Sequence, residues 1–266
     1  MTMGTSRGDR EAFIVCCWRL ALIAPSEISG ASKEPGESAQ PKFQMKGRSA
    51  KTWSAGFVRD DPMTLHEFTN EMRVAAEDDH LMDFARRYIL HGTPYVFRDR
   101  EADYYNFKRR LCGKFGVELP EVFVVGSAKL GYSPHKRTDF TLDSDIDLAI
   151  VSGDLFLRTS ELAASLEFRI RSQTVLLQQH HWKSYHRYLR HLVIGWMRPD
   201  LLPRVDPCIE FKDDWFSFFD ELSYGKAEVG NYKVTAGVFR SHRDLERYTV
   251  DSVKRIRNAL LVGGPQ

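Results

Sequence analysis

The sequence has few cysteines, and none of them is arranged for a metal or a disulfide framework. The four are Cys16, Cys17, Cys112 and Cys208. No Cys-x-x-Cys pair is present, and two adjacent cysteines do not have the spacing of a zinc site. This excludes a disulfide-stapled secreted domain and a zinc ribbon, and we expect reduced thiols in a cytoplasmic protein.

Long hydrophobic runs are also missing. No stretch reaches the roughly 20 apolar residues that a membrane-spanning helix needs. The nearest approach to a signal-peptide core is residues 13–24, which Arg19 interrupts, and Asp9 and Glu11 reduce the positive charge of the segment before it. We therefore expect neither a membrane span nor a cleaved leader.

The chain has little excess charge of either sign. Its formal net charge is +2 over 266 residues, so a basic surface for nucleic acid would have to be local. A hydrophobic content of 42% and a charged content of 28% are ordinary for a globular protein. The length fits one large domain or two small ones.

Residues 1–62 differ in composition from the rest of the chain. The part from Ser26 to Ser54 is rich in Ser, Gly, Lys and Pro, which predicts a disordered extension. Met63 then precedes Thr64 and Glu67, which have the spacing of a helix capping box. Either Met63 is the true start or residues 1–62 are a genuine tail, and N-terminal sequencing of the native protein would decide.

A central stretch, residues 122–151, carries the chemistry. The apolar run Val122–Val125 predicts a short buried strand, and Gly126-Ser127 follows it directly. After a polar loop, residues 146–151 are apolar except at Asp147, which predicts a second strand.

The flanking segments have mostly helical patterns. We expect two helices within residues 64–90, broken near residues 78–79; a helix over 101–115 ended by Gly116; a long helical region after 153; and a helix over 184–197. Beyond these come a weak strand at 209–211, a short helix over 215–222, a strand over 233–239 and a closing helix over 243–261.

Asp145 and Asp147 are candidate metal ligands. At positions i and i+2 of a strand they point to the same face, and Asp143 extends the row if the strand begins early. Neighbouring carboxylates repel unless a cation lies between them. Mg²⁺ suits such a pair, with Mn²⁺ as a substitute, because it takes its remaining ligands from water and substrate phosphates.

The Gly126-Ser127 turn is a candidate phosphate site. Its backbone N–H groups and the Ser127 hydroxyl can donate to phosphate oxygens, and glycine permits close approach. Lys129 follows in the same turn and is a candidate phosphate contact, although a lone lysine there is equally expected in solvent.

The aspartates have two other interpretations. An EF-hand that starts at Asp143 is excluded, because Leu148 would stand where the loop needs Gly and Asp154 where it needs Glu. A solvent-facing sheet surface is the other. Asp147 argues against it, since a carboxylate inside an apolar run is costly to bury alone.

The combination of Gly126-Ser127, Gly131 and Asp145-Ile146-Asp147 strongly resembles the nucleotidyltransferase superfamily of DNA polymerase beta. The match covers about thirty residues. The resemblance implies that Asp145 and Asp147 bind the catalytic metals and that Gly126 and Ser127 bind a nucleoside triphosphate. The remainder of the chain is similar, more vaguely, to bacterial members near the phage-defence second-messenger synthases.

The chain departs from the family pattern in two places. The connection is extended by residues 132–142, whose His135, Lys136 and Arg137 either touch the triphosphate or form a solvated loop. The third carboxylate that the family places on a later strand is not obvious. The nearest candidates are Asp206 and Glu210, although Pro207 weakens a central strand there.

The resemblance implies an α/β fold with a nucleotidyltransferase core over residues 63–197. Its small mixed sheet would be flanked by helices, and a mostly helical lobe, residues 198–266, would close the nucleotide cleft. The basic residues of that lobe (Arg240, Arg243, Arg247, Lys254, Arg255 and Arg257) face either a nucleotide or RNA end or solvent, and we favour solvent.

The expected reaction is Mg²⁺-dependent transfer of a nucleoside monophosphate from an NTP such as ATP to a hydroxyl, with release of pyrophosphate. The acceptor would be another nucleotide, giving a second messenger in antiviral defence, or a protein hydroxyl, or an RNA 3′ end. The alternative is a catalytically inactive member that binds nucleotide or a partner protein.

Overall fold

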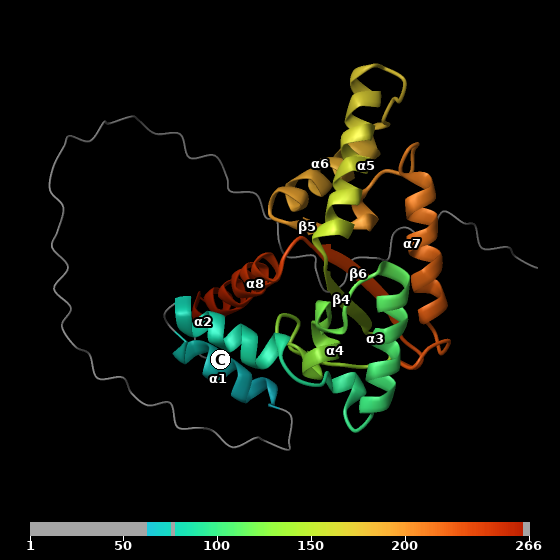
Figure 1. Ribbon diagram of the computed structural model, residues 1–266. Coiled ribbons are helices and arrows are strands. Elements are labelled where there is room, and N and C mark those ends of the chain that lie inside the picture. The colour runs from blue at the N-terminus through green and yellow to red at the C-terminus, as the bar shows by residue number, and fades with distance from the viewer. Residues whose placement is uncertain (1–62, 76–77, 263–266) are drawn as a thin grey trace, which may run out of the picture.

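The computed structural model describes residues 63–75 and 78–262. The predicted disordered extension, residues 1–62, lies outside this part of the chain. A mixed four-stranded sheet is flanked by helices, as expected (Figure 1). Its strand order is β1 (Val122–Val125), β4 (Asp145–Val151), β6 (Lys233–Phe239) and β5 (Trp196–Met197). β4 and β6 are parallel, and the two outer pairings are antiparallel.

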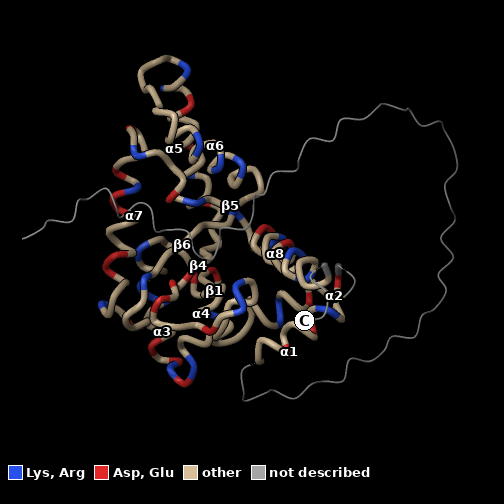
Figure 2. The backbone as a smooth tube through the Cα atoms, turned by 180° about the vertical axis from the view of Figure 1, so that it is seen from behind, with Lys and Arg blue, Asp and Glu red and all other residues tan. Residues whose placement is uncertain are grey.

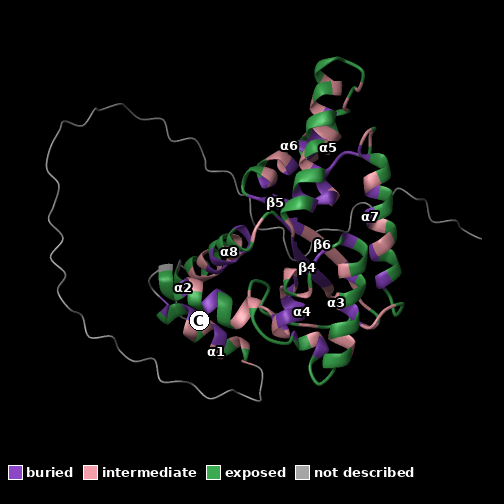
Figure 3. Ribbon diagram, in the orientation of Figure 1, coloured by how far each residue is buried: buried purple, intermediate pink, exposed green. Residues whose placement is uncertain are grey.

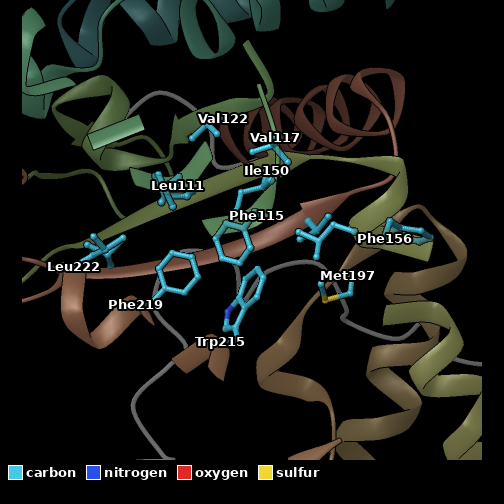
Figure 4. Close-up of a cluster of buried hydrophobic side chains, with 14 of the residues drawn as sticks. Leu111, Phe115, Val117, Val122, Ile150, Phe156, Met197, Trp215, Phe219 and Leu222 are labelled. Atoms are coloured by element: carbon cyan, nitrogen blue, oxygen red, sulfur yellow. The ribbon is translucent and has the colours of Figure 1, made fainter. Parts of the chain in front are cut away.

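One face of this sheet forms the main core. Ile146, Leu148 and Ile150 of β4 point to it and pack with buried side chains of α3 (Glu101–Phe115), α5 (Gly153–Arg171) and α7 (Ile209–Leu222). Aromatic rings fill the space beneath the sheet, where Phe115 lies 5.0 Å from Trp215 and 5.9 Å from Phe219, centroid to centroid (Figure 4). Such pairs add about 0.5–1.5 kcal/mol each beyond their area burial.

The opposite face of the sheet packs against α8 (His242–Val262). Ala149 and Val151 of β4 share a buried cluster with Phe239 of β6 and Leu245 of α8. Because alternate residues of a strand point to the same face, Asp145 and Asp147 also lie on this side. On this face of the sheet, the second half of β4 is therefore covered by apolar side chains, whereas its first residues present the carboxylates of Asp145 and Asp147.

Three helical segments precede the sheet and pack against α8. They are α1 (Leu65–Val74), α2 (Asp78–Phe84) and a π-helix (Ala85–Leu90). The predicted capping box is confirmed, since the Thr64 hydroxyl accepts from the Glu67 amide and the Glu67 carboxylate accepts from the Thr64 amide. Phe68 and Met72 form a second core with Val253 of α8. Short 3₁₀ segments follow at Tyr95–Phe97 and Leu119–Glu121.

A pair of helices projects from the sheet, away from α8. It consists of α5 and α6 (Gln179–Val193), and its tip is largely exposed (Figure 3). The helix predicted over 184–197 begins earlier and ends at Val193, because the chain turns at Gly195, whose φ is +81°, into β5. A short 3₁₀ segment, Pro199–Leu201, follows β5.

Two features of the second half differ from the sequence-based expectation. Ile209–Phe211, expected as a weak strand, is the first turn of α7, whose buried residues Trp215, Phe219 and Leu222 recur at helical spacing. The strand β6 lies between β4 and β5, so the sheet draws on both sides of the expected boundary between residues 197 and 198. Within residues 63–75 and 78–262, no helix is both long and apolar enough to span a membrane.

Acidification is expected to destabilise the fold through His191. The side chain is 3% exposed, and burial lowers its pKa to about 4 from an ordinary value of 6.5, with Arg198 and Arg187 acting in the same direction. Between these two pKa values the unfolded chain binds more protons than the folded one. Stability contributed by neutral His191 is therefore lost as the pH falls from about 6.5 toward 4.

We predict that the free energy of unfolding falls between pH 7 and pH 5 by about 1–2 kcal/mol more in the wild-type chain than in His191→Phe. Urea unfolding at both pH values measures the difference. His186→Gln, at an exposed histidine of the same helix, is the matched control for removing a histidine from α6. Equal pH dependence in the wild type and His191→Phe would contradict this role for His191.

Candidate functional site

The pairing of β1 with β4 brings the Gly-Ser turn beside the two aspartates. The strands are antiparallel, with Val125 opposite Asp147. Because Gly126 and Ser127 come directly after Val125, the chain leaves β1 alongside the first residues of β4. The structure thus brings together four of the residues that the sequence singled out, at one end of the sheet.

Gly126 cannot be replaced without strain. Its φ is +68° and its ψ is −147°, a conformation that L side chains rarely adopt. A Cβ there would lie 3.4 Å from Oδ2 of Asp147, at the lower limit of ordinary van der Waals contact. The missing side chain keeps the space beside this carboxylate open. Ser127 then begins the four-residue helix α4 (Ser127–Leu130) and is itself buried.

Asp147 is held by the strand on its other side. It is 4% exposed, and Thr235 Oγ1 donates a hydrogen bond to its Oδ1 at 2.8 Å. Thr235 stands opposite Asp147 in the register of β4 and β6. A buried carboxylate is costly unless it is hydrogen-bonded or paired, so this contact offsets part of the cost and fixes the direction of the side chain.

Asp145 is less buried and lies among cationic groups. Burial raises the pKa of its carboxyl, while the nearby ammonium groups of Lys233 and Lys136 oppose that rise. Lys233 is the residue opposite Asp145 on β6, and Lys136 comes from the turn between β2 (Tyr132–Ser133) and β3 (Thr138–Asp139). The charge of Asp145 also helps to raise the pKa of the Tyr224 phenol, although burial of the phenol is the larger cause.

A pocket of about 240 Å³ opens beside Gly126, Ser127 and Asp147. Helix α8 forms its other wall with Tyr248 and Arg255, and most of the remaining lining is apolar. A larger pocket, about 490 Å³, lies among α1, α2 and the π-helix, but neither aspartate lines it. We give weight to the smaller pocket, because Asp147 and the Gly-Ser turn line it.

Lys129 does not point toward the carboxylates. It is 8% exposed, and its Nζ donates to the backbone carbonyls of His91, Gly92 and Thr93 at 2.5, 2.7 and 3.4 Å. Burial lowers the pKa of its ammonium to about 8. In this arrangement Lys129 ties α4 to the segment that follows the π-helix, which is a structural role.

The expected third carboxylate is not brought to the pair. Asp206 forms an ion pair with Arg169 of α5. Arg169 lies about 24 Å along this helix from the first residue of the helix. Helix α5 begins just after the last residue of β4, whereas Asp145 is the first residue of that strand. Glu210 is exposed in the first turn of α7, a helix that packs on the other face of the sheet. The Pro207 that follows Asp206 also keeps this segment out of the sheet.

The basic residues of the C-terminal segment are divided between partners and solvent. Arg240 is paired with Asp244 at 3.0 Å, Arg255 is paired with Asp251, and Arg257 donates to the Ala75 carbonyl at 2.8 Å. Arg255 also lines the pocket, with its side chain 44% exposed. In Figure 2 the positions of acidic and basic residues are interspersed along the backbone of α8.

The donor set suits one divalent cation. Among the described residues there is no cluster of three or more His, Cys, Asp or Glu that could hold a metal. Asp145 and Asp147 nevertheless share a face, and the side-chain-free position at Gly126 leaves room beside Asp147. Mg²⁺ is commonly bound by one or two carboxylates together with substrate phosphates, so these two residues could hold one ion.

Sequence reasoning did not identify Lys233 and Thr235, which stand beside the aspartates. The strand that carries them was predicted, and its alternation already placed both on one face. Their position opposite Asp145 and Asp147 depends on the parallel register of β6 with β4, which no local pattern specifies.

No known family, curated protein or solved structure was found to match this chain.

Replacing Lys129 with Met is predicted to lower the free energy of unfolding by about 1–3 kcal/mol, because the carbonyls of residues 91–93 lose a charged donor. Thermal or urea denaturation measures this. Lys114→Met is a suitable control, since Lys114 makes an ion pair with the exposed Asp214, and surface pairs contribute about 0–1 kcal/mol. A Lys129→Met protein of normal stability that has lost affinity for nucleoside triphosphate would instead favour the phosphate role expected from the sequence.

Proposed function

We propose that this protein is a metal-dependent nucleotidyltransferase of the DNA polymerase beta type. It would move a nucleoside monophosphate from a nucleoside triphosphate to a hydroxyl acceptor and release pyrophosphate. The observation that carries the proposal is the antiparallel pairing of β1 and β4. It sets the Gly126-Ser127 turn beside Asp145 and Asp147 at one end of the sheet. A triphosphate bound with a cation needs phosphate-binding N–H and hydroxyl groups next to carboxylates that bind the cation.

Each residue has a distinct task in this proposal. Asp145 and Asp147 would hold the cation, which when bound neutralises phosphate charge and polarises the phosphoryl group. The Ser127 hydroxyl and the backbone at Gly126 would orient the phosphates, and Thr235 fixes the Asp147 carboxylate through its hydrogen bond.

The reaction itself is a substitution at phosphorus. The acceptor oxygen forms a bond to the α-phosphorus while the bond from that phosphorus to the leaving pyrophosphate breaks. The electron pair of the broken bond leaves with the pyrophosphate, and the hydroxyl proton passes to water. Positioning and charge stabilisation supply most of the catalysis in such transfers.

A second candidate is a nucleotide-binding protein without transferase activity. It is favoured by the absence of a third carboxylate on β6, whose sequence is KVTAGVF. The acceptors considered for the enzyme (a nucleotide, a protein hydroxyl or an RNA 3′ end) are separated by the nature of the labelled product.

Incubation with α-³²P-labelled NTPs, Mg²⁺ and candidate acceptors tests the proposal. We expect a labelled product whose formation falls by more than about 100-fold in Asp145→Asn and in Asp147→Asn, because each change removes a charged ligand. The matched control is Asp154→Asn, an exposed residue beyond the far end of β4, which should retain activity. No product from any NTP, with retained NTP binding, would identify the protein as the inactive binder.

A further inference from the structure

The strand β6 completes the surface around the two aspartates with residues that carry no negative charge. In the parallel register, Lys233 stands opposite Asp145 and Thr235 stands opposite Asp147. The two strands have the same alternation in this pairing, so all four side chains lie on one face of the sheet. The neighbouring strand therefore offers this site an ammonium group and a hydroxyl group.

Thr235 occupies the position from which a further carboxylate could reach Asp147. Its Oγ1 donates to Oδ1 of Asp147 at 2.8 Å, so the hydroxyl acts as a donor to the existing ligand. A neutral hydroxyl adds no charge that would attract another cation. Asp147 is thereby positioned without any increase in the negative charge of the site.

Positive charge near Asp145 balances the negative charge of the two aspartates, so the site has no surplus of carboxylates. Lys233 stands opposite Asp145 in the register of β4 and β6, and Lys136 comes from the turn between β2 and β3. The formal charges of these two lysines cancel those of Asp145 and Asp147. A pair of divalent cations 3.5–4 Å apart, the spacing typical of two-metal sites, repel strongly and need several carboxylates to hold them.

We infer that this site takes one divalent cation with the nucleoside triphosphate, and that the Lys233 ammonium supplies the positive charge a second metal would bring. The inference rests on the proposed function, because it concerns the same two aspartates. It specifies the ligand as a nucleoside triphosphate bound with a single Mg²⁺ or Mn²⁺. Thr235 is a positioning residue in this arrangement, and Lys233 is a contact for the phosphates.

Electron paramagnetic resonance with Mn²⁺ measures the number of bound ions without relying on activity. The full chain is titrated with Mn²⁺ in the presence of saturating α,β-methylene-ATP, which cannot be cleaved at the relevant bond. We expect one bound Mn²⁺ per chain and a spectrum without the spin coupling of two neighbouring ions. Two bound and coupled Mn²⁺ ions in the wild-type protein would overturn the inference and leave the proposed function standing.

Substitutions on β6 give the second arm of the experiment. Thr235→Asp should bind a second, coupled Mn²⁺, whereas Thr174→Asp, at an exposed threonine between α5 and α6, should bind one. Lys233→Met should weaken binding of the analogue about tenfold or more, because a charge-assisted contact to phosphate is lost. Unchanged affinity of Lys233→Met would overturn the role given to this lysine.

Failure of the proposed function has its own signature. A wild-type chain that binds neither the analogue nor Mn²⁺, while its circular dichroism shows a folded protein, would overturn the proposed function and the inference with it. The wild-type ion count needs no variant, so misfolding of Thr235→Asp does not affect the decision.

Discussion

Strand β4 lies inside the sheet, with a hydrogen-bonded strand on each side. Hydrogen bonding to β1 on one side and β6 on the other fixes which of its side chains face the core. Ile146, Leu148 and Ile150 enter the main core, so Asp145 and Asp147 must emerge on the other face. A slip of one residue would bury both carboxylates among aromatic rings, at a cost of several kcal/mol each. The apolar side chains of the strand therefore determine where its carboxylates are presented.

Local patterns predicted most of the elements but not the way they assemble. The capping box at Thr64, the helix stop at Gly116 and the alternation of residues 233–239 each depend on neighbours within a few positions, and the structure has all three. The segment 209–211 was misjudged because its three residues fit either a strand or a helical turn. Only the buried aromatic residues further along α7 show that one helix continues through it.

The candidate site, too, could be predicted only as far as local sequence patterns reach. Asp145, Asp147, Gly126 and Ser127 could be found because they belong to one short stretch with a defined spacing. Their neighbours on β6 are almost ninety residues away in the chain, and the parallel register that brings them together is a property of the whole sheet. The same long-range packing directs Lys129 to the carbonyls of residues 91–93, which its position after Ser127 did not indicate.

We propose that the first residues of β4 and the turn after β1 form one site for a metal-bound triphosphate. Anomalous diffraction from crystals of the protein soaked with Mn²⁺ and α,β-methylene-ATP can locate both the ion and the nucleotide. We expect a manganese peak within coordination distance of Asp145 and Asp147, with the phosphates lying against Gly126 and Ser127. A nucleotide bound elsewhere, with no manganese at these aspartates, would contradict it.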